Sequence, residues 1–144
     1  MTANSPSSAA APAVLVEISP GELIDKLTIL LIKRDRIADS AKQRHILAEL
    51  AAIEAARDKS LPLSAELARL TGELRAINTA LWEIEDAIRL CEREQDFGPR
   101  FIELARAVYH QNDQRAALKR QVNELLGAAF SEQKSYADYQ APTE

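Results

Sequence analysis

A polar stretch interrupts the last apolar pattern of the chain, and its residue types could form a binding site. Segment 109–115, with the sequence YHQNDQR, separates two apolar stretches of one predicted helix. Helices in a bundle present an apolar residue every three or four positions, so the buried side here must pass through Asn112 and then Arg115 or Lys119. One interpretation is a polar pocket at mid-bundle, where helices converge on a ligand. The other is that Asn112 sets the helix register, or that the helix end projects into solvent.

A second polar group lies on the preceding helical pattern, between positions 82 and 89. If the two patterns form a helical hairpin that turns at Phe97, the two polar groups face each other. The structural alternative is that Glu85 and Arg89 form an i,i+4 ion pair, worth about 0.3–0.5 kcal/mol. The candidate binding residues of the two segments are Trp82, Glu85, Asp86, Arg89, Arg106, Tyr109, Asn112 and Asp113.

The strongest local signal in the chain is a helix start at Ser19. Ser19 suits the N-cap, Pro20 suits the first helical position, and Glu22 completes a capping box. Glu22, Asp25 and Lys26 form a third candidate binding group. Each of the three also has a structural explanation, because Glu22 and Lys26 are spaced as an ion pair and Asp25 suits a helix N-terminus.

Patterns typical of metal sites, cofactor sites and catalytic triads are missing from the sequence. His45 and His110 are far apart, and each lies in a charged stretch. The lone Cys91 has the spacing of a small buried hydrophobic residue. We therefore expect no metal and no cofactor, and the balance leans away from an enzyme.

Glycine and proline are scarce, which favours long helices. Segment 22–61 contains neither residue and shows apolar residues at helical spacing. Asp39-Ser40 interrupts this pattern, and Ser40 could cap a new helix, so the segment is either one kinked helix or two helices in line. Its first part is apolar on more than one side, which indicates a central helix or a subunit interface.

The cleanest pattern follows a break at 61–64. We call its apolar positions the seam: they alternate in steps of three and four, as in a coiled coil, while Gly72 lies on the opposite side. Pro99 opens a last helix after a turn at 96–98, and Gly127 supplies its C-cap. We predict an all-α antiparallel bundle of about three long helices with coiled-coil-like packing. The seam consists of Leu67, Leu70, Leu74, Ile77, Leu81, Ile84, Ile88 and Cys91.

Composition divides the chain into three parts: an Ala/Ser/Pro-rich disordered arm (1–16), one helical domain (17–130) and a polar tail (131–144). Val14–Ile18 forms an extended lead-in, and Tyr136 and Tyr139 are docking points in the tail. The formal net charge of -4, without a basic stripe, argues against nucleic acid. The arm lacks the features of a signal peptide, and no apolar run approaches the ~18 residues of a membrane span. We expect a cytoplasmic protein with no membrane partner.

Several strings resemble segments of an uncharacterised family of small bacterial helical proteins. The resemblance covers residues 17–139 and implies no established activity, only a loose association with glycosyltransferase-type proteins. It also implies that the polar residues in these strings belong to the family's signature. The strings are ISPGELIDKLTIL (18–30), LWEIED (81–86), FIELARAVY (101–109) with Asn112-Asp113, RAALKR (115–120) and EQKSY (132–136).

A narrower resemblance is to the all-helical chorismate mutases. Segment 23–25, followed by 29–31 and Arg34, is similar to their first helix, and three long helices match their architecture. Their chemistry needs cations that hold two carboxylates. Segment 20–22 stands where the family carries an arginine. The cations that the resemblance implies here are Lys26, Lys33, Arg34 and Lys42.

The sequence thus favours a non-catalytic helical module that binds a partner protein or forms a homo-oligomer such as a homodimer. The unbroken seam and the apolar first helix support this hypothesis. The alternative is a small-molecule or enzymatic site at mid-bundle, chorismate-mutase-like or related to nucleotide sugars. The facing polar groups support that alternative.

Overall fold

The computed structural model describes residues 11–128 and 133–141, and within these ranges the protein is all-α. It has four helices: α1 (Pro20–Arg36), α2 (Ser40–Ser60), α3 (Ala65–Arg93) and α4 (Pro99–Leu126). The all-α prediction is confirmed, but the predicted number of about three long helices is too low. Residues 1–10 of the predicted arm, and 129–132 and 142–144 of the predicted tail region, lie outside the described residues.

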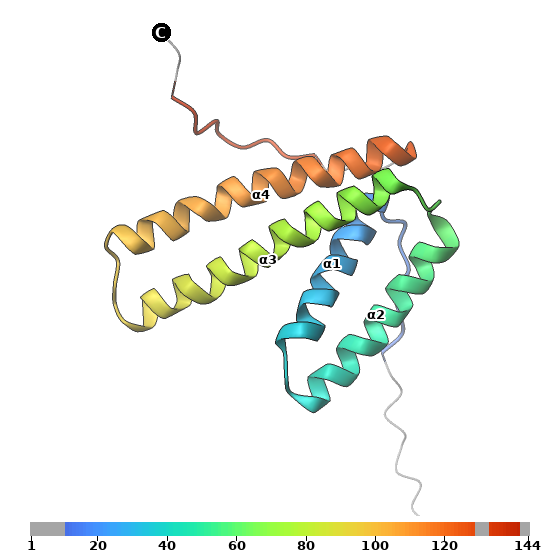
Figure 1. Ribbon diagram of the computed structural model, residues 1–144, viewed down its shortest axis with the longest axis horizontal. Helices are drawn as coiled ribbons and strands as arrows, with labels where there is room; N and C mark the ends of the chain where they lie inside the picture. The colour runs from blue at the N-terminus through green and yellow to red at the C-terminus, as the bar shows by residue number, and fades with distance from the viewer. Residues whose placement is uncertain (1–10, 129–132, 142–144) are drawn as a thin grey trace, which may run out of the picture.

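The additional helix arises because the chain reverses between α1 and α2 (Figure 1). Asp39, rather than the predicted Ser40, caps α2 by accepting a backbone N–H at 2.9 Å. The side chain of Gln43 donates to the carbonyls of Arg34 and Ile37, which closes the end of α1. The predicted split near residues 39–40 is therefore confirmed, but the two helices do not lie in line: α1 and α2 form a hairpin.

Helix α1 is the central element, as its apolar residues on several sides indicated. It contacts α2, α3 and α4, whereas among the helices α2 contacts α1 alone. Most of α1's core side chains are fully buried. The core consists of Ile24, Leu27 and Leu30 of α1, Leu50 of α2, Leu67, Leu70 and Leu74 of α3, and Val122 of α4.

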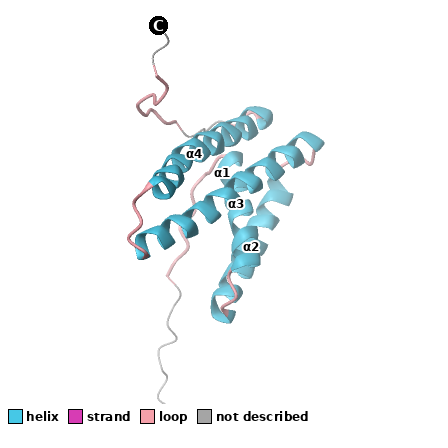
Figure 2. Ribbon diagram, turned by 60° about the vertical axis from the view of Figure 1, so that its left-hand side comes forward, coloured by secondary structure: helices cyan, strands magenta, loops and turns pink. Residues whose placement is uncertain are grey.

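Helices α3 and α4 form a long antiparallel hairpin, and α1 crosses only part of it (Figures 1 and 2). The seam is buried where α1 covers it: Leu70 is 1% exposed and Leu74 is 0% exposed. From Ile77 to Ile88 the seam residues are only partly buried, although α1 still contacts α3 at Asn78 and, through Arg36, at Glu83. We call residues 80–112 the outer half of the hairpin.

Local signals read from the sequence hold at several positions. Ser19 caps α1 by accepting the Glu22 N–H at 3.2 Å, and Gly127 ends α4 with φ 62° and ψ 40°. Cys91 is buried, and Gly72 faces open space. Within the described ranges, no helix is both long and apolar enough to span a membrane.

Candidate functional site

A buried polar cluster joins α1, α3 and α4, and it centres on Asp25. Arg115 makes two parallel hydrogen bonds to this carboxylate, from Nε to Oδ1 at 2.9 Å and from Nη2 to Oδ2 at 2.6 Å. The Asn78 side chain donates to Asp25 Oδ1 and to Thr28 Oγ1, both at 2.9 Å. We call these four residues the polar cluster. Three helices thus supply one hydrogen-bonded group at their crossing.

The environment keeps the Asp25 carboxyl ionised. Burial raises its pKa, but the hydrogen bonds from Arg115 and Asn78, and the positive charges of Arg115 and Lys119, together hold the pKa below its usual value. A general base works best with a pKa near the operating pH. The polar cluster therefore has the electrostatics of an ion pair that orients helices rather than those of a proton-transfer site.

A second contact layer fixes the start of α1 against α4. Glu22 pairs with Lys119 at 2.6 Å, and the Gly21 N–H donates to Asn123 Oδ1 at 2.7 Å. A Cβ on Gly21 would lie 2.5 Å from the backbone oxygen of Lys119, which no side chain can tolerate without a backbone shift. Glycine is therefore required where α1 approaches α4.

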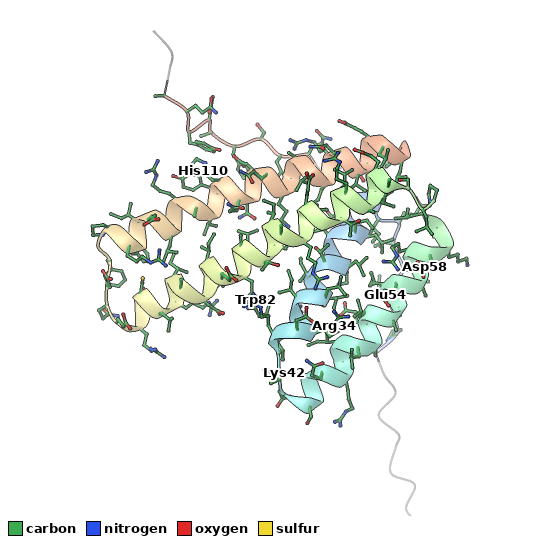
Figure 3. The ribbon with its side chains drawn as sticks, in the orientation of Figure 1. Arg34, Lys42, Glu54, Asp58, Trp82 and His110 are labelled. Atoms are coloured by element: carbon green, nitrogen blue, oxygen red, sulfur yellow. The ribbon has the colours of Figure 1, made fainter. Side chains whose placement is uncertain are left out.

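The expected Glu22–Lys26 pair is not formed, because each residue has another partner. Lys26 binds Glu49 of α2 at 2.8 Å, and Glu22 binds α4 as described above. Lys26 lines a hollow of about 390 Å³ between α1 and α2, together with Lys33 and three carboxylates. Two cations and three carboxylates are a poor match for a dianionic ligand. Arg34 pairs with Asp35 at 3.1 Å, and Lys42 is exposed near the start of α2 (Figure 3).

The charged residues predicted on α3, Glu85, Asp86 and Arg89, are exposed. Glu85 and Arg89 form an exposed ion pair at 2.6 Å, as the structural alternative expected. Asp86 and Arg106 are exposed. Figure 3 shows Trp82 on the side of α3 that faces α1 and α2, and His110 on the opposite side of α4.

The other predicted residues on α4 line a groove beneath the C-terminal segment 133–141. Tyr139 packs its ring 5.2 Å from that of Tyr109 and 4.7 Å from that of His110, measured between centroids. A hydrogen bond to Asp113 raises the pKa of Tyr139. The groove has a volume of about 800 Å³. The residues that line it include the binding candidates Tyr109, Asn112 and Asp113 and the two tail residues predicted as docking points, Tyr136 and Tyr139.

Sequence comparison connects these elements to a known family. The model of a family of unknown function, DUF6165, matches residues 14–143. The chain belongs to this DUF6165 family. No curated protein and no solved structure matches it. The resemblance to an uncharacterised family is thereby confirmed, whereas the comparisons do not show the likeness to chorismate mutases.

The DUF6165 match extends beyond the four helices at both ends. It includes the extended residues before α1 and the segment that carries Tyr136 and Tyr139. In this DUF6165 chain, Tyr139 docks on α4 as the sequence predicted, while Tyr136 lines the groove with an exposed ring.

Sequence reasoning on this DUF6165 protein missed two of the four residues of the polar cluster. Asp25 was a candidate and Arg115 lay in the candidate polar segment 109–115, but Asn78 and Thr28 were not singled out as site residues. A usable signal existed: Arg115, Lys119 and Asn123 are spaced by four, which places them on one face of α4. Among the described residues, no three His, Cys, Asp or Glu side chains are placed to hold a metal ion.

Proposed function

We propose that this protein is a non-catalytic interaction module that self-associates through the outer half of its α3–α4 hairpin. The observation that carries the proposal is the change in burial along the seam. Leu70 and Leu74 are buried by α1, but from Ile77 to Ile88 the seam is only partly covered. An apolar stripe that extends beyond its covering helix supports an interface there.

The outer half of the hairpin also carries exposed apolar side chains. Leu90, Phe97 and Ile102 are 46%, 49% and 55% exposed, respectively, and all three lie toward the hairpin turn. Phe97 also packs edge-on against Phe101, with ring centroids 5.4 Å apart. These side chains give the outer half an apolar surface of the kind found at helix–helix interfaces.

A second copy of the chain is the partner that fits this surface. Outside residues 80–112, α1 crosses the hairpin and covers it. In the outer half, an equivalent hairpin related by a two-fold axis would place one uncovered stripe against its own copy. Two hairpins packed in this way form a four-helix bundle, which is a stable arrangement for half-covered apolar stripes.

Light scattering after size exclusion, over a range of protein concentrations, tests the proposal. We expect wild type to have twice the mass of one chain and the Leu90→Glu and Ile102→Glu variants to have the mass of one chain. Leu47→Glu is the matched control, since Leu47 is 48% exposed but lies on α2. Circular dichroism checks that every variant remains helical. A wild type that is monomeric throughout, or equal effects of all three substitutions, contradicts the proposal.

A second candidate function is small-molecule binding in the groove beneath segment 133–141. The groove volume of about 800 Å³ is within the range of ligand sites, and aromatic and amide groups line it. A thermal-shift screen with carboxylates and nucleotide sugars tests this candidate. A ligand that stabilises wild type but not Tyr109→Ala or Asn112→Ala supports it, and a screen without such a ligand counts against it.

A further inference from the structure

Residues 11–18, which precede α1 and lie outside any helix, are the most exposed apolar segment that the structure describes. Val14, Leu15 and Val16 are 86%, 92% and 73% exposed, respectively. Within the described ranges, no backbone hydrogen bond joins residues 11–18 to any other part of the chain. Figure 1 shows this segment running from the start of α1 past α2, outside the helices. It is therefore apolar and unpaired at the same time.

The sequence of this segment is typical of a β-strand. Three of the residues in 14–18 are β-branched, and Glu17 is the single charged residue there. Pro12 lacks a backbone N–H and sets the N-terminal limit of pairing. Residues 13–18 would span about 20 Å as a strand, which is an ordinary strand length.

The end of the segment is held rigidly, which prepares it to bind. Ser19 is buried and caps α1, and the next residues are fixed against α4 through the Gly21–Asn123 hydrogen bond of 2.7 Å. A strand that leaves a fixed point loses less entropy on binding than a free peptide does. Its direction of exit is also set by the bundle.

We infer that residues 13–18 add as a strand to the open edge of a β-sheet in another protein, and that this sheet is covered on both faces. This inference concerns a different surface from the hairpin interface and does not depend on it. Unpaired N–H and C=O groups of an extended segment complete the hydrogen-bond ladder of an exposed sheet edge.

The order of the apolar residues selects the kind of sheet. Successive side chains of a strand point to opposite faces, so Val14, Val16 and Ile18 share one face. Leu15 lies on the other face, which Glu17 shares at the end of the segment, so the run 13–16 is apolar on both faces. Continuous apolar runs are typical of strands in α/β proteins, where helices cover both faces of the sheet. Pairing with the same segment of a second copy would form only a two-stranded ribbon, with at least one apolar face in water.

The test places a photoreactive phenylalanine analogue at Glu17 of the full chain, in cells that naturally make the protein. Mass spectrometry then identifies the residue to which it cross-links. The matched control carries the analogue at Leu63, which is 88% exposed in the loop between α2 and α3. We expect position 17 to cross-link to an edge strand of an α/β protein, at a yield well above that of position 63.

A proline scan at positions 14, 15 and 16 separates strand addition from simple apolar contact. Alternate N–H groups of an edge strand point to the neighbouring strand, and proline removes the N–H but tolerates extended backbone. We expect the cross-linking yield at position 17 to fall roughly tenfold for Val14→Pro and Val16→Pro but not for Leu15→Pro. If the other set of N–H groups faces the partner, the yield falls for Leu15→Pro alone. Thermal unfolding should be unchanged, because the segment makes no internal backbone hydrogen bonds.

Three results would overturn the inference. The first is cross-linking to a second copy of this chain or to a helical surface of another protein. The second is a yield at position 17 no higher than that at position 63. The third is a similar loss of yield for all three proline variants, which would indicate side-chain contact without backbone pairing.

Discussion

Asp25 and Arg115 are 90 positions apart in the sequence, yet their side chains form a two-pronged ion pair with bonds of 2.9 and 2.6 Å. The carboxylate is almost fully buried, and Asn78 satisfies it from a third helix. This pair connects the central helix to the hairpin near the inner end of its uncovered stretch.

Removing one partner of this pair should cost far more stability than removing an exposed pair. We expect Arg115→Ala to lower the free energy of unfolding by about 2–4 kcal/mol, because it leaves a buried carboxylate without its cation. Arg89→Ala is the control, since its ion pair with Glu85 is exposed and worth at most about 0.5 kcal/mol. Urea unfolding measures both. Equal losses would mean that the Asp25 pair contributes no more than a surface contact.

The lowered pKa of Asp25 predicts a dependence of stability on acid. Its folded-state pKa lies below the unfolded value of about 3.9, so the stabilisation is complete above that value and is lost as the pH falls through the folded pKa. The Asn variant Asp25→Asn does not titrate. We expect the gap in unfolding free energy between wild type and this variant to narrow below about pH 4. A gap that stays constant down to the acid limit would exclude Asp25 as the titrating group.

Two glycine substitutions should change the free energy of unfolding in opposite directions. Gly21→Ala places a Cβ 2.5 Å from a backbone oxygen of α4, so we expect a loss of about 1–3 kcal/mol. Gly72→Ala meets no atom within 4 Å and lies inside α3, so we expect a gain of about 0.5–1 kcal/mol. Denaturant midpoints measure both changes. A neutral Gly21→Ala would show that α1 can move away from α4 without loss.

The docked C-terminal segment should be visible in tyrosine titration. The hydrogen bond to Asp113 raises the pKa of Tyr139, so the titration should contain a late step above the ordinary tyrosine pKa of about 10. Asp113→Asn removes the negative charge and should bring the late step back toward the ordinary range. Ultraviolet absorbance of tyrosinate follows the titration. If the late step persists in Asp113→Asn, the contact between Tyr139 and Asp113 is not its cause.

Features that depend on neighbouring residues could be predicted from the sequence. The cap at Ser19, the break at 61–64, the seam and the glycine end of α4 each follow from residue types within one or two turns. The docking of Tyr139 was also anticipated, since an aromatic residue in a polar tail gains from a contact with the bundle.

Features that depend on residues far apart in the sequence could not be predicted from it. The reversal at Asp39 was missed because the spacing of apolar residues is the same in both helices. That spacing does not show whether the second helix continues along the axis of the first or runs back beside it. The polar residues at 82–89 and 109–115 were expected to form one site, but Glu85 and Arg89 pair with each other at the surface, while Tyr109, Asn112 and Asp113 line a groove with the C-terminal segment. The polar cluster escaped notice because Asn78 and Thr28 look unremarkable until three helices cross.

The sequence by itself thus determined that this protein is helical, where its helices are capped and where an apolar seam runs, because those properties reside in local hydrogen bonds and side-chain spacing. Only the tertiary structure decided that α1 covers part of the seam, that Asp25 meets Arg115 and that the segment before α1 stays unpaired. Those outcomes depend on how the helices cross. A crossing is set by burial and charge pairing summed over the whole bundle rather than by any one stretch of residues.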